Sequence, residues 1–209
     1  MKIAVVAANG RVAKKVITEA VNRGHEVTGF GRKANNTDAQ NWVQKDLFDI
    51  TADDLKGFDA VVDAFGAWTE DTLPLHSTSL KHLCDILSGT DTRLYIVGGA
   101  GSLYVNKEHT ATVSDGPDFP DSFKPLASAM AKALGELRER KDVNWTYISP
   151  AGDFQADGER TGKYILGGEE LVLNKAGESV ISYADYAIAM VDVIEDGGHN
   201  QERISVVKE

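Results

Sequence analysis

The sequence predicts an α/β fold in which helices cover both faces of a mostly parallel sheet, the doubly wound arrangement. Short apolar runs rich in Val and Ile alternate with longer segments of helical spacing, which is typical of successive strand-helix-strand units. The chain has 209 residues, enough for one domain. Because 42% of them are hydrophobic, the chain can build a core and is not expected to be disordered.

The first half of the chain alternates regularly between the two patterns. Apolar residues such as Val12, Val16 and Ile17 share one face of a predicted helix, and Gly24 supplies its C-terminal stop. The same reasoning predicts strands over 2–7, 26–31, 42–45 and 60–65, and helices over 10–23, near 51–56 and over 71–87.

The second half continues the alternation and then changes character. We expect a strand over 93–97, an irregular loop over 106–120, a helix over 122–140 and a strand over 145–149. The loop contains Gly and Pro and is long enough to suggest a functional role. Beyond Pro150 we expect short strands within 162–174, a helix over 183–195 that starts at the capping-box pair Ser182 and Asp185, and a last strand over 203–207. Residues 150–209 are expected to form a small C-terminal lobe on the substrate side of a single domain, 1–209.

Charge and composition exclude several classes of protein. Lys and Arg number 22 against 32 Asp and Glu, so the formal charge is −10, and such a surface repels nucleic acid and anionic lipid. The apolar runs are far shorter than the roughly 18–20 residues needed to cross a bilayer. The single cysteine, Cys84, and a start that lacks a signal-peptide pattern indicate a reducing, cytoplasmic setting. We expect a monomer or homodimer.

Metal-ligand spacing is missing from the sequence. The five histidines show no ligand pattern and Cys84 has no partner cysteine, so we predict no metal. Acidic residues such as Asp63, Asp71 and Asp153 are expected to cap helices or lie in solvated turns.

The segment Ala7-Ala8-Asn9-Gly10-Arg11-Val12-Ala13 lies between the first strand and the first helix, where a Rossmann-type fold places its phosphate loop. A pyrophosphate needs free backbone N–H groups, a helix N-terminus and small residues that allow close approach. Only Gly10 is a glycine here, and Ala stands at two positions of the usual glycine pattern. An ordinary tight turn is the alternative.

The end of the second strand should decide between NAD and NADP. An acidic residue there would hold the ribose hydroxyls, whereas an arginine would accept a 2′-phosphate. The chain has Arg32 and Lys33 and no neighbouring carboxylate, so NADP is preferred and NAD stays possible. A solvated basic pair in a surface turn is the alternative interpretation.

Two further strand ends supply candidate cofactor contacts. Asp46 follows the third strand and could accept the adenine amino group, or it could cap a short helix. Small residues follow the fourth strand where ribose and phosphates must pass, in the run Ala64, Phe65 and Gly66. Trp68, just beyond, is either exposed at the mouth of the site or packed against the next helix.

The chain resembles the bacterial NADH-flavin reductase-like proteins of the atypical short-chain dehydrogenase superfamily, relatives of the flavin reductase also called biliverdin reductase B and of NmrA-like proteins. The resemblance covers nearly the whole chain. Its most specific stretches are Val97-Gly98-Gly99-Ala100-Gly101-Ser102-Leu103, Trp145-Thr146-Tyr147-Ile148-Ser149-Pro150-Ala151, Gly158-Glu159-Arg160-Thr161-Gly162 and Ile181-Ser182-Tyr183-Ala184-Asp185-Tyr186-Ala187.

The resemblance implies a pyridine nucleotide across the carboxyl ends of the strands. Its phosphates would lie against Ala7, Asn9, Gly10, Arg11 and Val12, its 2′-phosphate against Arg32, and its adenine against Asp46 and Leu47. The nicotinamide end would be lined by Gly98, Gly99, Ser102, Pro150 and Phe154. We expect Trp68, Tyr104 and Phe154 on the substrate side, and Tyr104 could instead be buried against the long loop.

The chemistry follows from a residue pair that the chain lacks. Short-chain dehydrogenases protonate a carbonyl oxygen with a Tyr-x-x-x-Lys pair, but no tyrosine here has a lysine four residues later, and Ser128 and Lys132 occupy the corresponding helix. Lys132 could contact ribose hydroxyls or be a solvated helix charge. A flavin or quinone accepts hydride into a conjugated ring and can take its proton from water, so we predict such an acceptor, with flavin a substrate rather than a tightly bound group.

Ser102 is the candidate catalytic residue, because its hydroxyl could bond the acceptor or the nicotinamide carboxamide; it could also only satisfy its own loop. Two other functions use the same fold. An NmrA-like redox sensor would bind the nucleotide without turnover. A nucleotide-sugar epimerase or dehydratase is disfavoured, since the Tyr-Lys pair and a large C-terminal substrate domain are both missing.

Overall fold

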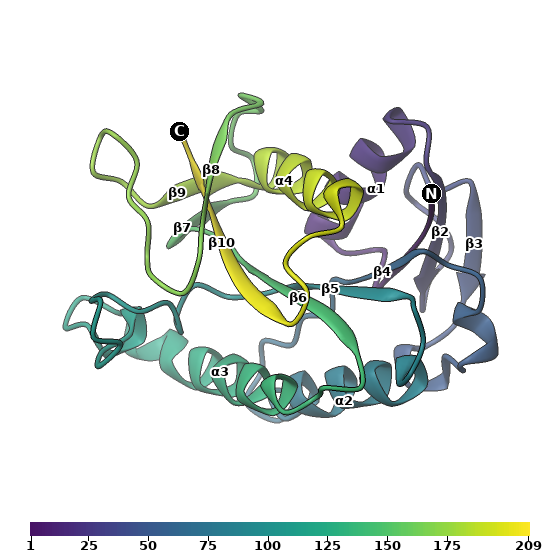
Figure 1. Cartoon of the computed structure of the whole chain (residues 1–209), viewed down its shortest axis with the longest axis horizontal. Helices are drawn as coiled ribbons and strands as arrows, with labels where there is room; N and C mark the ends of the chain where they lie inside the picture. The colour runs from purple at the N-terminus through teal and green to yellow at the C-terminus, as the bar shows by residue number, and fades with distance from the viewer.

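A twisted eight-stranded sheet divides the chain into two helical layers in the computed structural model, which describes residues 1–209. Helices α1 and α4 lie on one face of this sheet, and α2 and α3 lie on the other (Figure 1). The strand order is β3-β2-β1-β4-β5-β6-β10-β8, with every strand parallel to its neighbours except β8. The predicted doubly wound α/β fold is therefore confirmed.

The elements follow the predicted alternation closely. The strands are β1 Lys2–Val6, β2 Glu26–Gly31, β3 Asn41–Gln44, β4 Ala60–Asp63, β5 Arg93–Val97, β6 Asn144–Ser149, β7 Asp153–Gln155, β8 Tyr164–Gly167, β9 Val180–Ser182 and β10 Glu202–Lys208. The helices are α1 Arg11–Asn22, α2 Leu75–Leu87, α3 Lys124–Arg138 and α4 Tyr183–Asp196. Strands β7 and β9 form a separate two-stranded parallel sheet.

Differences from the predicted elements have local causes. The predicted helix near 51–56 is only the single 3-10 turn Asp53–Leu55, and the helix expected from residue 71 begins at Leu75, directly after Pro74. Pro is favoured in the first turn of a helix because its missing N–H is not needed there. Within 162–174 one strand, β8, forms and pairs with β10 along the edge of the main sheet.

The core has one cluster on each side of the sheet. On the α1 and α4 side, the residues Val16, Ile17 and Ala20 of α1 are fully buried, as their helical spacing predicts. On the α2 and α3 side, Leu80 and Leu83 pack with Trp145 and Tyr147 of β6. Burial on both faces explains why strands such as β1 are apolar at nearly every position.

The start of α4 uses half of the expected capping box. The Ser182 hydroxyl accepts the Asp185 N–H at 3.0 Å. The Asp185 carboxylate does not return to Ser182 but accepts hydrogen bonds from the backbone of Thr161 and Gly162 and from the Thr161 hydroxyl. This buried carboxylate therefore holds the loop before β8 against α4.

Candidate functional site

The candidate site lies along the edge of the sheet at which the parallel strands end. Parallel strands bring their carboxyl ends to the same edge, and ligands of open α/β sheets bind there. The loops after β1, β2, β4, β5 and β6 all meet at this edge. These loops carry most of the residues that the sequence predicts to contact a nucleotide.

The turn after β1 presents unpaired amides at the start of α1. Ala7 has a positive φ of 56°, and Gly10 caps the helix without any side-chain hydrogen bond. The first helical hydrogen bond runs from the Lys14 N–H to the Gly10 carbonyl at 3.0 Å. The N–H groups of Arg11, Val12 and Ala13 are consequently free, and they point out of the positive end of the helix dipole. This arrangement suits an anion.

Arg11 lies beside these amides on the surface. Its guanidinium is 3.3 Å from the Asp157 carboxylate and 5.9 Å from the centre of the Tyr183 ring. Both members of the ion pair are well exposed, so the pair contributes little to stability. Arg11 can therefore turn toward a bound phosphate at small cost.

Asn9 connects the phosphate loop to the loop after β2. Its side-chain amide donates hydrogen bonds to the Ala34 carbonyl at 3.1 Å and to the Asn36 Oδ1 at 2.9 Å. Gly31 is required at this junction, because an added Cβ would lie 2.4 Å from the Asn9 Oδ1 and 2.7 Å from the Trp42 ring. Asn9 thus orients the loop rather than offering its amide to a phosphate.

Three successive carbonyls of the loop after β2 are held by side chains. Gln44 Nε2 donates to the Arg32 carbonyl at 3.2 Å and Trp42 Nε1 donates to the Lys33 carbonyl at 3.1 Å, and Asn9 holds the third at Ala34. The side chains of Arg32 and Lys33 are exposed and form no ion pair. The loop therefore presents two cations that have no protein partner.

Of the two predicted adenine contacts, Asp46 caps a 3-10 turn and Leu47 is buried in the core. The Asp46 Oδ1 accepts the Phe48 N–H at 2.9 Å and caps a 3-10 turn, as one of its two interpretations proposed. The Leu47 side chain is buried in the core beside α2. Only the backbone of Leu47 and the second carboxylate oxygen of Asp46 remain to face an adenine.

Trp68 lies in the open rather than against the next helix. Its side chain is 76% exposed, and its ring covers Gly66 so closely that an added Cβ would lie 2.9 Å from it. His76 holds this loop through a hydrogen bond of 2.9 Å between its Nε2 and the Ala67 carbonyl, and it packs edge-on against Phe65. Ala64, Phe65 and Gly66 begin this loop, directly after the carboxyl end of β4.

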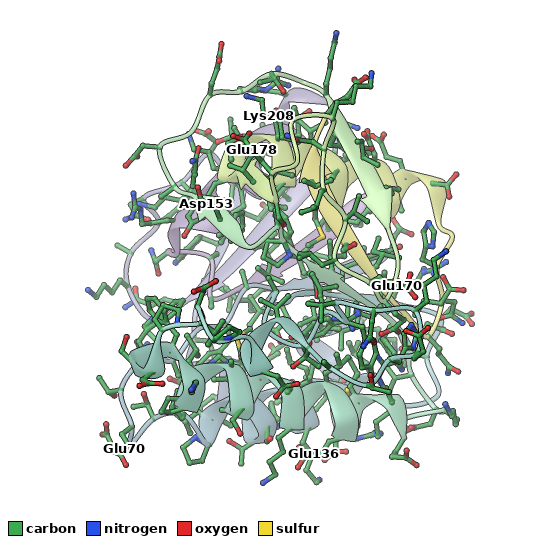
Figure 2. All side chains as sticks on the ribbon, turned by 90° about the vertical axis from the view of Figure 1, so that its left-hand side faces the viewer. Glu70, Glu136, Asp153, Glu170, Glu178 and Lys208 are labelled. Atoms are coloured by element: carbon green, nitrogen blue, oxygen red, sulfur yellow. The ribbon has the colours of Figure 1, made fainter.

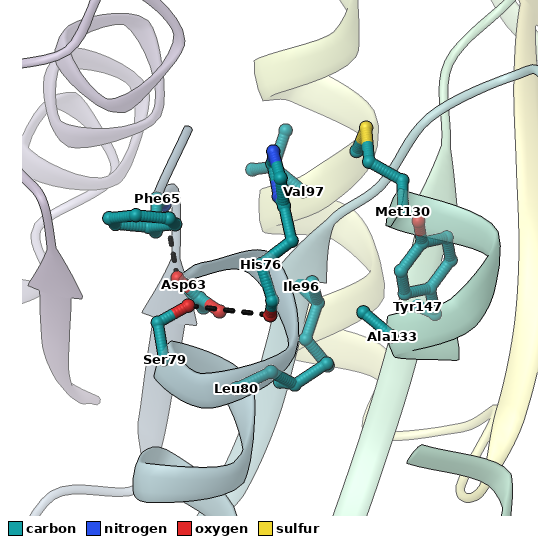
Figure 3. A pocket seen from close by; sticks show the side chains of 10 residues that line it. All are labelled: Asp63, Phe65, His76, Ser79, Leu80, Ile96, Val97, Met130, Ala133 and Tyr147. Atoms are coloured by element: carbon teal, nitrogen blue, oxygen red, sulfur yellow. Dashed lines mark hydrogen bonds between the residues drawn. The ribbon is translucent and has the colours of Figure 1, made fainter. Parts of the chain in front are cut away.

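Asp63, expected to cap a helix or to lie in a solvated turn, is buried instead. It is only 4% exposed and borders a cavity of about 20 Å³ between β4, α2 and α3 (Figure 3). A cavity of this size has room for one water molecule. Burial raises the pKa of Asp63 to about 6, against the opposing effect of the 3.0 Å hydrogen bond that it accepts from the Phe65 N–H.

The glycine run after β5 is shaped by Tyr147. A Cβ on Gly98 would lie 2.2 Å from the Tyr147 ring, and the Gly99 N–H donates to the Tyr147 hydroxyl at 3.2 Å. Burial raises the pKa of Tyr147 above its usual value. The predicted cofactor residues Gly98 and Gly99 thus form a shelf directly over a buried tyrosine ring.

The face of α3 toward this shelf is apolar. A Cβ on Gly101 would meet Ala127 at 2.9 Å, and a Cβ on Gly99 would meet the Met130 sulfur at 3.1 Å. Lys132 lies on the outer face instead, with its side chain 71% exposed and 3.7 Å from Glu136. The structure therefore supports the interpretation of Lys132 as a solvated charge.

The remaining predicted residues follow β5 and β6 in the sequence. Ser102 is half-buried and accepts a hydrogen bond of 3.2 Å from Arg203. Tyr104 stacks on His109 with ring centres 4.2 Å apart. Phe154 packs against Tyr183 and Tyr186, and Pro150 is buried just after β6.

Sequence reasoning did not single out Arg203, Asn36, Gln44 or Tyr147. A signal existed for Arg203, because this charged residue stands directly before the mostly apolar run Ile204-Ser205-Val206-Val207. Such a residue is almost never fully buried unless it is paired. No local signal identified Tyr147, whose ring resembles any other core aromatic.

No group of three or more His, Cys, Asp and Glu side chains is arranged to hold a metal ion. No helix combines the length and the apolar character that crossing a bilayer requires.

Known proteins resemble this chain over its full length. A family model described as NAD(P)H-binding matches residues 7–197. The Bacillus subtilis protein YwnB is 42% identical over 212 residues, which cover 100% of this chain and 99% of that protein.

Solved structures give the same result. A Streptococcus pneumoniae protein, named provisionally as an NADH-flavin reductase, is 55% identical, covers 100% of both chains and superposes with a TM-score of 0.98. A Bacteroides thetaiotaomicron protein, named provisionally as an epimerase, is 32% identical with a TM-score of 0.86 and covers 99% of this chain and 96% of its own.

Proposed function

Because this chain belongs to the NAD(P)H-binding family, we propose that it is an NAD(P)H-dependent oxidoreductase that delivers hydride to a flavin or quinone-like acceptor and prefers NADPH. One juxtaposition carries the proposal. The free amides at the start of α1 and the unpaired cations Arg32 and Lys33 lie on adjacent loops that Asn9 joins. A pyrophosphate and a 2′-phosphate on one nucleotide would use both.

The residues present fit a dinucleotide. The N–H groups of Arg11, Val12 and Ala13 would bind the pyrophosphate, and Gly10 lets the backbone approach it. The Arg11 guanidinium would add a charge-assisted hydrogen bond. Ala64 to Gly66 would flank the ribose on the nicotinamide side, with Gly98 and Gly99 as the shelf beneath the nicotinamide ring.

The preference for NADPH is proposed from the loop after β2. The carbonyls of residues 32–34 each accept a hydrogen bond from a side chain of the protein, so the backbone of this loop is held in place beside the phosphate loop. Arg32 would contact the 2′-phosphate through its planar fork, and Lys33 would add a second positive charge. NADH lacks this phosphate and would gain nothing from either residue.

The acceptor class is proposed from the apolar face of α3. Reduction of a carbonyl to an alcohol needs a positioned acid. The residues of α3 that face the glycine shelf are Ala127 and Met130, and neither can donate a proton. The bound nicotinamide would supply hydride, and a conjugated ring acceptor can take its proton from solvent. Epimerase chemistry, which needs the missing tyrosine, is disfavoured for the same reason.

The protein's contribution would be to position the acceptor and exclude water. Trp68, Tyr104 and Phe154 would supply aromatic surface on the substrate side, and Ser102 would supply the hydroxyl that bonds the acceptor. We propose that the flavin enters as a substrate and leaves after reduction.

Purified protein mixed with NADPH or NADH and with riboflavin, FMN or menadione tests this proposal. We expect steady loss of the reduced-nucleotide absorbance with at least one acceptor, and a lower KM for NADPH than for NADH. Tight binding of NADPH without turnover of any acceptor would overturn the enzyme proposal and favour the redox-sensor alternative. Calorimetry that detects no binding of either nucleotide would overturn both.

A further inference from the structure

We propose that Arg203 is a positioning residue for the acceptor side of this site, holding Ser102 directly and Tyr104 through Glu169. The inference rests on the proposed function and extends it to a residue of the last strand, β10. It concerns a buried cation that neither the phosphate loop nor the cofactor loops explain.

Arg203 lies on β10, the strand next to β6, and its side chain contacts Ser102 in the loop after β5. It is 3% exposed, and its guanidinium donates to the Ser102 carbonyl at 3.0 Å, to the Ser102 Oγ at 3.2 Å and to the Ser149 Oγ at 3.3 Å. Ser149 ends β6, and Ser102 closes the glycine run after β5. One side chain therefore joins three segments around the proposed acceptor side.

The bond to Ser102 has a direct consequence for the serine proton. Because the Ser102 Oγ accepts from the guanidinium, its own hydrogen stays available for donation, and no protein group accepts it. A hydroxyl whose lone pair is already engaged points its proton in a restricted direction. Arg203 would thus convert a freely rotating hydroxyl into an oriented donor for the acceptor ring.

Glu169 compensates the buried positive charge. Its Oε2 accepts from the Arg203 Nε at 3.0 Å and from the Nη2 at 2.8 Å, and Arg138 of α3 donates to both of its oxygens at 2.8 and 2.9 Å. Burial alone would raise the pKa of Glu169, but the hydrogen bonds and charges of the two arginines lower it overall. The pair is therefore ionised and strongly held.

The same segment fixes Tyr104. The Tyr104 N–H donates to the Glu169 carbonyl at 2.9 Å, and the Leu171 N–H donates to the Tyr104 carbonyl at 2.8 Å. His109, stacked on the Tyr104 ring, is held by Glu170 at 2.6 Å. In Figure 2, Glu170 and Asp153 lie on opposite sides of the view. The backbone of Tyr104 is thus bonded to Glu169, and the side chain of Glu169 is bonded to Arg203.

Arg203→Lys tests the inference, because lysine keeps the charge but cannot hold Ser102, Ser149 and Glu169 at once. We expect the KM for riboflavin to rise and kcat to fall, each by about tenfold, while the Kd for NADPH by calorimetry stays within about twofold of the wild type. Riboflavin binding to the NADP-loaded protein, followed by quenching of flavin fluorescence, should weaken in parallel.

The matched control is Arg93→Lys. Arg93 also ties separate segments together, by donating to the carbonyls of Gly197 and Gly198, but it begins β5 at the opposite edge of the sheet. A merely structural role for Arg203 predicts that both variants lower Tm alike and leave flavin KM unchanged. We expect only Arg203→Lys to affect the flavin parameters.

Ser102→Ala separates the two links. If Arg203 acts by orienting Ser102, adding Ser102→Ala to Arg203→Lys should change kcat by less than about twofold, whereas independent effects would multiply. Multiplying effects would overturn the link through Ser102, and wild-type flavin kinetics in Arg203→Lys would overturn the whole inference. If Arg203→Lys does not fold, Glu169→Gln and Ser102→Ala replace it. A wild-type flavin KM in both of these variants would likewise overturn the inference. A wild-type protein that neither binds nor reduces a flavin or quinone would instead refute the proposed function.

Discussion

The Asn9 side-chain amide donates a hydrogen bond of 3.1 Å to the carbonyl of Ala34, so one side chain joins the phosphate loop after β1 to the basic loop after β2. The two loops are 25 residues apart in the sequence. The free amides of α1 and the cations of the second loop are consequently held in a constant relation before any nucleotide arrives. Preorganisation of this kind lowers the entropy cost of binding.

Asn9→Ala should weaken NADPH more than NADH. The variant loses the bonds to Ala34 and Asn36, and the loop that carries Arg32 becomes free to move. We expect the Kd for NADPH to rise about tenfold, which corresponds to one or two hydrogen bonds, as measured by calorimetry. Asn144→Ala, which removes a similar bond to the Thr90 carbonyl far from the site, should leave both Kd values unchanged. Equal weakening of NADPH and NADH would contradict the proposed coupling.

Arg32→Ala should remove most of the selectivity for NADPH. A charge-assisted hydrogen bond contributes about 1.5–3 kcal/mol, so the Kd for NADPH should increase roughly 10-fold to 100-fold and that for NADH much less. Titration of the two nucleotides under identical salt gives the ratio. Lys56→Ala, an exposed cation before β4 at the opposite edge of the sheet, is the control. A variant that loses both nucleotides equally would refute the 2′-phosphate assignment.

Asp63→Asn should stabilise the protein, and more so at high pH. The folded-state pKa of Asp63 is about 6, whereas an unfolded aspartate titrates near 4. Below the unfolded value both states are protonated, and the penalty of burying the carboxylate develops between about pH 4 and pH 6 and is constant above that range. The variant should gain about 3 kcal/mol in free energy of unfolding at pH 8 and about half of that at pH 5. Urea unfolding at both pH values measures the gain, and equal gains would show that Asp63 is not responsible.

Gly98→Ala should destabilise the glycine shelf. The new Cβ would lie 2.2 Å from the ring of Tyr147, a buried residue. Overpacking of this kind costs about 1–3 kcal/mol, visible as a lower midpoint in urea. Gly168→Ala adds a methyl group in open space and should change the free energy of unfolding by less than about 0.5 kcal/mol. Similar midpoints for the two variants would be evidence against the contact with Tyr147.

Sequence patterns predicted the architecture and the cofactor edge because both follow from local periodicity. Alternating strands and helices require parallel pairing, and parallel strands place the loops after β1, β2, β4 and β5 along one edge. The sequence therefore predicts that Ala7 to Ala13 and the basic pair at Arg32 lie near each other. For Trp68 the sequence allowed both an exposed and a packed position, and the tertiary structure decided for the exposed one.

Side-chain partners were decided only by the folded chain. Ser102 meets Arg203 across 101 residues of sequence, and their contact depends on the placement of β10 beside β6. Leu47 turned into the core and Lys132 turned outward because each occupies one particular face of its segment. Asp63 became buried because α2 and α3 close over the end of β4. Periodicity specifies which face of an element is apolar, whereas the identity of a distant partner depends on how the elements are placed in the assembled sheet.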